Sequence, residues 1–382
     1  MKKLIKVAIS AALLLTLAVP YPNKRISAES IQSDNAKIEQ TVNNFFQAYE
    51  NTNLNYNDAS QIMDFLNNDI LSLDNKVEKS NAERVELMLE RREIIDENNE
   101  LDLKEYNKNM NITYNEFNIA EDTATVDISV EKEWNYKFSS DVQSGSVDDY
   151  EISLKKDNSD WKITSVDGLI NEYADSELQQ LDSDSTIITE TKRKNYLSTF
   201  KSDLKEEKKV TEKEIPVASI LSSSYNRTSA TKYALKYALS PNSAYPYYSE
   251  DCTNFISQCL VAGGISMHYG TTGTNTCWYY SSSSSRSSSW AGAKYFRLYL
   301  QSTQCKIKWS SSNWSSVANG DIIQLLSNSQ AFHSLIVTGI EYGSSGRSDI
   351  LFCCHTTNKR HVSLAEYYPT ATKAYYHITG RE

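Results

Sequence analysis

Residues 251–260 read Asp-Cys-Thr-Asn-Phe-Ile-Ser-Gln-Cys-Leu, and they follow a loop rich in Tyr, Pro and Ser. Apolar side chains recur three, four and seven positions after Cys252, which predicts a helix with one buried face. A Gly-Gly pair at 263–264 ends this helix. Cys252 is therefore expected in the first turn, where unpaired N–H groups and the helix dipole favour a thiolate over a thiol.

A histidine later in the chain is the expected partner of this cysteine. His333 begins the run His-Ser-Leu-Ile-Val-Thr-Gly, residues 333–339, which reads as a buried strand. A histidine beside a thiolate can form an ion pair with it and supply a proton to a leaving group. Cysteine first and histidine later, on a strand, is the chain order of papain-type enzymes. We therefore expect Cys252 to be a nucleophile and His333 its general base and acid. A merely buried cysteine is the alternative.

A third group is expected to hold the His333 imidazole in one tautomer. His355 ends the strand that follows the His333 strand, and a Gly-Ser-Ser-Gly turn at 343–346 would bring the two histidines close in an antiparallel pair. Asn358, three residues further on, is the alternative third residue. The sequence favours His355 but does not fix the register that would decide between them.

The first residues have the composition of a secretory signal. Lysines at positions 2, 3 and 6 precede an apolar segment, residues 7–19, that is too short to span a bilayer comfortably. The tripeptide Ile-Ser-Ala at 26–28 offers a cleavage site, with cleavage after Ala18 as the alternative, so residues 1–28 are assigned to a signal peptide. No later segment is apolar for long enough to cross a membrane. We expect an exported protein without stable membrane insertion once the signal is removed.

The length of 382 residues predicts two domains. The first, residues 29–170, shows helical spacing followed by period-two alternation, so we expect an α+β domain. Its pattern resembles the nuclear-transport-factor-two-like fold, and without clustered histidines or paired carboxylates we expect a structural or binding role. The expected helices are Ile38–Tyr49, Asp58–Leu71 and Ala82–Ile95, and the expected strands are Asn111–Ala120, Thr123–Phe138, Asp148–Lys155 and Asp160–Val166.

Residues 171–222 lose the apolar periodicity and read as a charged, solvated linker. The second domain, residues 223–382, begins with helices and continues with strands. Ser281–Ser289 is a low-complexity stretch that reads as a mobile surface loop. The expected helices are Ala230–Leu239, the Cys252 helix and Trp290–Leu300, and the expected strands are Ile322–Leu326, Ser334–Glu341, Asp349–Cys354 and Ala374–Ile378.

Five sequence blocks occur in a fixed order between residues 225 and 382. They are the stretch 252–264, the tryptophans Trp278 and Trp290, Gly320-Asp321, His333-Ser334 and His355-Thr356. This succession resembles the putative amidase domain family of Gram-positive secreted proteins. That family is similar to CHAP-type and NlpC-type cell-wall hydrolases, which share a papain-like core.

The resemblance implies a fold and an activity. The fold would be a papain-like domain of helices and a small antiparallel barrel. The activity would be that of a secreted cysteine amidohydrolase, which cleaves amide bonds of peptidoglycan through an acyl-enzyme at Cys252 and a Cys-His dyad or triad. Relatives place a tyrosine hydroxyl in the oxyanion hole beside the Cys252 N–H, and Tyr245 is the candidate here. A protein-directed cysteine protease and a non-catalytic wall-binding module are the alternatives.

Charge and cysteine content bear on partners and cofactors. From residue 216 onward the chain carries 13 Lys and Arg against 7 Asp and Glu, whereas the preceding part carries 26 against 42. A basic C-terminal half would be drawn to anionic wall polymers, and its scattered basic residues argue against nucleic acid. All six cysteines lie from Cys252 onward, with no Cys-x-x-Cys or His-x-x-x-His spacing. We therefore expect no metal site, no cofactor and no dense disulfide framework.

Overall fold

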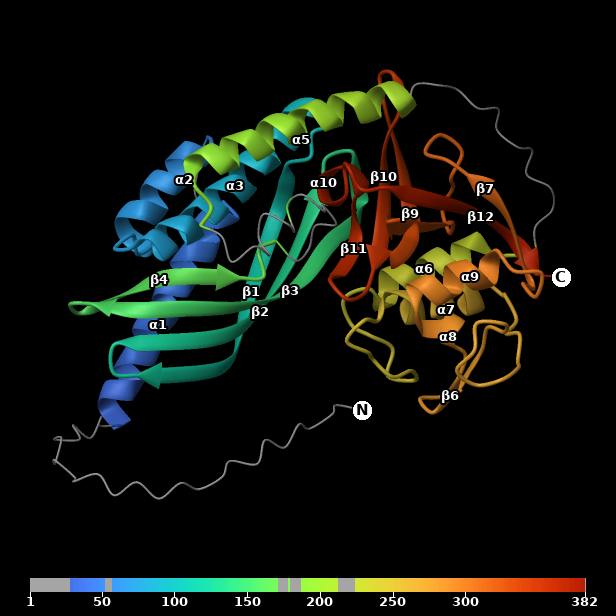
Figure 1. Cartoon of the computed structure of the whole chain (residues 1–382), viewed down its shortest axis with the longest axis horizontal. Coiled ribbons are helices and arrows are strands. Elements are labelled where there is room, and N and C mark those ends of the chain that lie inside the picture. The colour runs from blue at the N-terminus through green and yellow to red at the C-terminus, as the bar shows by residue number, and fades with distance from the viewer. Residues whose placement is uncertain (1–27, 52–56, 171–177, 179–186, 212–223, 382) are drawn as a thin grey trace.

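The computed structural model describes residues 28–51, 57–170, 178, 187–211 and 224–381 (Figure 1). The signal peptide expected over residues 1–28 lies outside the described residues except for Ala28, as does much of the linker expected over 171–222. Among the described helices, none is both long enough and apolar enough to cross a membrane.

The N-terminal half consists of helices laid over an antiparallel meander, as the α+β expectation states (Figure 1). Its inner face follows from the alternation of β2, in which every second side chain from Ala124 to Tyr136 is buried. Val126 and Ile128 join Phe45 and Phe46 of the first helix in one core. The elements are α1 (Ala28–Tyr49), α2 (Ala59–Phe65), the π-helix η1 (Leu66–Ile70), α3 (Lys76–Asn98), β1 (Glu105–Ala120), β2 (Thr123–Tyr136), β3 (Ser139–Asp157) and β4 (Asp160–Asp167).

Part of the expected linker is instead a packed helix, α5 (Glu190–Thr211). Tyr196, Leu197 and Phe200 lie on one side of it and are buried in the core of the N-terminal half. Arg193 adds ion pairs to Glu83, Glu86 and Glu90 of α3. The linker expectation fails here because the many charged residues of this segment mask a short apolar stripe at helical spacing.

The C-terminal half carries four of its helices, α6, α7, α8 and α9, on one side of its strands, where Figure 1 shows them gathered together. Asn226 begins the first of them by accepting a hydrogen bond from the Ser229 N–H at 2.9 Å. The elements are α6 (Arg227–Tyr237), α7 (Cys252–Ala262), β5 (Tyr280–Ser282), β6 (Ser285–Arg286), α8 (Ser288–Ala291), α9 (Ala293–Leu300), β7 (Ile307–Ser312), β8 (Ile322–Ser327), β9 (Gln330–Gly343), β10 (Gly346–Cys354), β11 (Asn358–Ser363), α10 (Leu364–Tyr367) and β12 (Lys373–Arg381).

The two halves share one open sheet. Its strand order is β1-β2-β3-β11-β10-β9-β8-β12-β7, with β4 added beside β3, and every pairing is antiparallel. The junction is formed by Gly145–Val147 of β3 and Asn358–Arg360 of β11. The described strands therefore form no closed barrel, which corrects the barrel expected for the second domain. The reason is that the edge strand β11 pairs with the N-terminal half instead of closing on its own domain.

The C-terminal part of this sheet has two differently covered faces. Ile322 and Ile336 face α7 and share a core with Phe255. Their neighbours Ile323 and Leu335 face the other way, into a core that contains Tyr367, Tyr368 and, from β2, Trp134. Side chains of successive strand residues alternate between these two faces, so the register of β9 decides which residues can reach α7.

Candidate functional site

The cysteine at the start of α7 lies where the sequence predicts it. Cys252 is the first residue of the helix, is 4% exposed and has a free thiol. It is packed against Ala293, Leu326 and Ala331, which come from the start of α9 and the β8–β9 hairpin. Its sulfur lies 3.6 Å from Thr253 Oγ1. The thiol is thus held at the meeting point of a helix N-terminus and a hairpin.

The thiol is not activated in this state. Burial raises the pKa of Cys252, and this effect outweighs the hydroxyl of Thr253 and the backbone N–H of Ser334, which favour the thiolate. A helix N-terminus normally lowers a thiol pKa. Here, however, the N–H of Cys252, the first in α7, points at another oxygen, and the N–H of Thr253, which favours the thiolate, does not offset the burial. The structure describes a neutral, desolvated thiol.

That oxygen belongs to Thr356. The backbone N–H groups of Asp251 and Cys252 both donate to Thr356 Oγ1, at 3.0 and 3.2 Å. Two backbone donors that converge on one oxygen beside a nucleophile have the arrangement of an oxyanion hole. Thr356 has a φ of 88°, a left-handed conformation that a β-branched residue rarely adopts. Two backbone donors at the start of α7 therefore converge on one side-chain hydroxyl oxygen.

Two tryptophans fix the orientation of α7. Trp290 Nε1 donates to Asn254 Oδ1 at 2.7 Å, and Trp278 Nε1 donates to Ser257 Oγ at 2.9 Å. Asn254 also donates to the Pro246 carbonyl at 2.9 Å, which ties the preceding loop to the helix. These contacts explain why polar residues lie on an otherwise buried helix, since each one satisfies a buried partner.

His355 supports the loop before the cysteine. Its Nδ1 lies 2.6 Å from Asp251 Oδ2, and its Nε2 lies 2.8 Å from the Tyr237 carbonyl oxygen. Both ring nitrogens are thus taken up by oxygens of other residues. The Phe255 ring stacks on the His355 ring with a centroid distance of 4.0 Å. His355 has no ring nitrogen left to orient His333, the role that the sequence analysis favoured.

His333 lies on the face of β9 that points away from α7. It pairs with Leu325, and its ring contacts Tyr368 at a centroid distance of 6.0 Å. The register shifts at this point, because Ala331 pairs with Leu326 and Phe332 is an extra residue, as in a β-bulge. Among the described residues, no contact joins this ring to Cys252.

The His333 ring is buried, and one of its nitrogens, Nε2, lacks a hydrogen-bond partner among the described residues. Burial lowers the pKa of His333 to about 4, so the ring is neutral near pH 7. The expected Cys-His pair is therefore not assembled in this structure. The bulge is the physical reason, since one extra residue turns the side chains on either side of it to opposite faces.

The polar neighbours of the thiol are residues that the sequence analysis did not single out for a role. Thr253 Oγ1 lies 2.9 Å from Ser334 Oγ, which accepts a hydrogen bond from Gln324 Nε2 at 3.1 Å. Gln324 also donates to the Ala293 carbonyl at 3.1 Å. Thr253 and Ser334 each follow a predicted catalytic residue directly, which is the only sequence signal that could have identified them.

The two remaining candidates lie at the rim. The Tyr245 ring packs against Trp290 and Tyr280, at centroid distances of 6.1 and 5.3 Å, and its hydroxyl makes no hydrogen bond to Cys252 among the described residues. Asn358 Oδ1 accepts from the Tyr247 hydroxyl at 3.2 Å, on the turn that carries Thr356. Across the residues that the structure describes, no group of three or more His, Cys, Asp or Glu side chains could hold a metal ion.

Comparisons with known proteins agree with the amidase resemblance for the C-terminal half. Residues 224–379 match the family model described as "Putative amidase domain". "Uncharacterized protein YjcM" of Bacillus subtilis (strain 168) is 34% identical over 143 residues, which cover 34% of this chain and 32% of that protein. "Uncharacterized protein YhbB" of the same strain is 39% identical over 84 residues, covering 22% and 26%. The chain thus spans less than a third of the length of these relatives. No solved structure matches it.

Proposed function

We propose that residues 224–379 form a cysteine amidohydrolase that cleaves amide bonds of cell-wall peptidoglycan outside a Gram-positive cell. The match to an amidase family supports the reaction class. The observation that carries the proposal is the convergence of the Asp251 and Cys252 N–H groups on one oxygen next to the thiol. Such donors stabilise the charge that develops on a carbonyl oxygen during acyl transfer.

In this proposal Cys252 attacks the substrate carbonyl carbon, and the carbonyl oxygen replaces Thr356 Oγ1 between the two N–H groups. The tetrahedral intermediate expels the amine, which takes up a proton, and leaves a thioester on Cys252. Water then attacks the thioester, releases a carboxylic acid and restores the thiol. His333 is the proposed carrier of these protons.

The role of His333 requires a local change in β9. Its ring must leave the core that contains Tyr368 and turn toward α7. Bulges re-aim side chains next to active sites, and a shift of the bulge at Phe332 by one residue would turn His333 to the face of Cys252. The unpaired Nε2 favours such a change, because this nitrogen has no hydrogen bond to lose among the described residues.

Substitution of the histidine tests this scheme. His333→Ala should lower the rate of peptidoglycan hydrolysis by a factor of about 10² to 10⁴, the usual contribution of a general base. His268→Ala is the control, because His268 bonds to Tyr299 at 3.0 Å, away from the thiol. Hydrolysis at the wild-type rate by a folded His333→Ala variant would exclude the role.

A non-catalytic wall-binding module is the second candidate, and the separation of His333 from Cys252 favours it. Binding of the full chain to cell walls without bond cleavage would support this reading. A protein-directed protease shares the same chemistry, and cleavage of casein in preference to peptidoglycan would point to it.

For each of these functions we propose that the protein is exported by its N-terminal signal, and that the basic C-terminal half binds anionic wall polymers.

A further inference from the structure

The oxygen that occupies the candidate oxyanion hole belongs to a residue at the protein surface. Thr356 is exposed, although its Oγ1 accepts from the backbone N–H groups of Asp251 and Cys252. A substrate carbonyl needs the same two donors, so it must first displace this hydroxyl. The left-handed φ of 88° means that the surrounding structure holds Thr356 in a conformation it would not adopt alone. The turn 355–358 therefore blocks the two N–H groups with the Thr356 hydroxyl. Contacts with the rest of the protein keep the turn in this position.

The two ends of this turn are held by different parts of the molecule. At its start, His355 bonds to Asp251 and to the Tyr237 carbonyl, both within the C-terminal half. At its end, Asn358 pairs with Val147 of β3, in the N-terminal half. The turn thus connects the two halves, and Thr356 lies two residues before Asn358, where the pairing with β3 begins.

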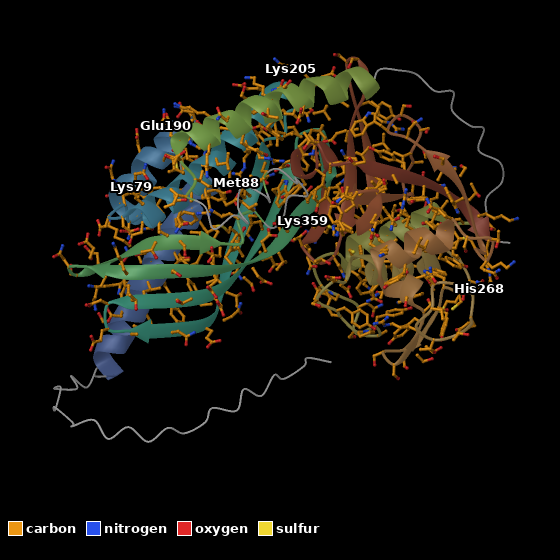
Figure 2. The ribbon with its side chains drawn as sticks, in the orientation of Figure 1. Lys79, Met88, Glu190, Lys205, His268 and Lys359 are labelled. Carbon is orange, nitrogen blue, oxygen red and sulfur yellow. The ribbon has the colours of Figure 1, made fainter. Side chains whose placement is uncertain are left out.

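The junction itself is built from buried charge and hydrogen bonds. Lys359 is fully buried and its ammonium group pairs with Asp148 of β3, at the place that Figure 2 labels between the two halves. Arg360 pairs with Glu133 at 2.6 Å, and Ser144 Oγ donates to the His361 carbonyl at 2.6 Å. Asp148, Glu133 and Ser144 all lie outside residues 224–379, the part that matches the amidase family.

We infer that the N-terminal half is an intramolecular inhibitor of the C-terminal half, which holds the Thr356 hydroxyl in the oxyanion hole through the β3–β11 pairing. This inference rests on the proposed function, since it assigns the regulation of that same site. Release of β11 from β3 would let the turn relax from its left-handed conformation, withdraw the hydroxyl and free both N–H groups for a substrate oxygen. The freed donors would also lower the pKa of Cys252.

Alkylation of Cys252 by iodoacetamide tests the inference without requiring any hydrolysis. In the full-length chain, Thr356→Ala removes the hydroxyl, and Thr357→Ala is the matched control because Thr357 Oγ1 makes no hydrogen bond among the described residues. A thiol pKa lowered by one unit raises the thiolate fraction about tenfold below the pKa. We expect Thr356→Ala to be alkylated at Cys252 about tenfold faster than the wild type or Thr357→Ala. Equal rates in all three proteins would overturn the inference.

A second pair of variants tests the junction. Asp148→Ala breaks the buried ion pair with Lys359, whereas Asp149→Ala changes the exposed residue next to Asp148. We expect faster alkylation of Cys252 only in Asp148→Ala, and wild-type rates in both variants would show that β3 does not hold the turn. Peptide mapping of Cys259, which is fully buried, reports general unfolding. If iodoacetamide also labels Cys259 in Asp148→Ala, that variant has unfolded. The comparison of Thr356→Ala with Thr357→Ala then decides whether the turn blocks the site.

Peptidoglycan cleavage by the same proteins separates this inference from the proposed function. Faster alkylation with no cleavage product from any variant would support the blocking turn and refute the amidohydrolase. Cleavage by the wild type, with no gain in alkylation or cleavage in Thr356→Ala, would leave the amidohydrolase in place and refute the blocking turn.

Discussion

The uncompensated burial of His333 predicts that acid destabilises this protein in a defined pH window. Its pKa falls from 6.5 to about 4 because the ring is desolvated in the folded state. Between these two values the unfolded chain binds a proton that the folded chain does not. The contribution of the neutral His333 ring to the free energy of unfolding is therefore fully present above pH 6.5, and it is lost as the pH falls from 6.5 through 4. One pKa unit corresponds to 1.36 kcal/mol, so the expected loss is about 3 kcal/mol.

The substitution His333→Leu isolates this contribution, since leucine fills much of the same volume and does not titrate. The assay is guanidinium unfolding of both proteins at intervals from pH 7.5 to 4. Burial also lowers the pKa of His361 to about 4, so only the difference between the two proteins is informative. We expect the free energies of unfolding to diverge by about 3 kcal/mol, with the variant gaining relative to the wild type as the pH falls. A difference that stays constant with pH would refute the assignment of His333 as a buried neutral ring.

Two further predictions concern buried charges. Asp148→Ala should cost about 3–5 kcal/mol of unfolding free energy, because it breaks the buried ion pair with Lys359. The double variant Asp148→Leu with Lys359→Met should recover most of this loss, and no recovery would contradict this account. Burial raises the pKa of Asp349 from 3.8 to about 7, so its stabilising contribution is full below pH 3.8 and is lost as the pH rises through 7. Asp349→Asn should remove that part of the pH dependence in thermal melts, and unchanged curves would count against it.

Local periodicity predicted most of the secondary structure. Helical spacing from Ile38 and Ala82, and the alternation from Thr123, correspond to α1, α3 and β2, because each buries one face of an amphipathic element. The serine-rich stretch 281–289 was wrongly expected to be a mobile loop. Its first part forms the β5–β6 hairpin, and its last residues begin α8, where Ser289 is fully buried and donates to the Cys277 carbonyl. Composition alone cannot show such a bond, because the partner comes from another segment.

The arrangement of the site depends on long-range features that sequence does not reveal. The position of Cys252 at a helix start followed from local spacing. The face of the sheet to which His333 points depends on one extra residue in β9. A single bulge reverses the alternation of side chains between the two faces, which the rest of the strand follows. The bond of His355 to Asp251 and the pairing of β11 with β3 join segments far apart in the chain. No pattern within either segment indicates its partner.

The most direct test of the proposed function is digestion of Gram-positive peptidoglycan by the full-length chain, alongside Cys252→Ala. New termini would be identified by mass spectrometry. The proposal predicts new amines with either peptide or lactyl-linked carboxylates, released by the wild type and not by Cys252→Ala. Products from both proteins at equal rates would contradict a cysteine mechanism. The absence of products from both, and from Thr356→Ala, would contradict the amidohydrolase itself.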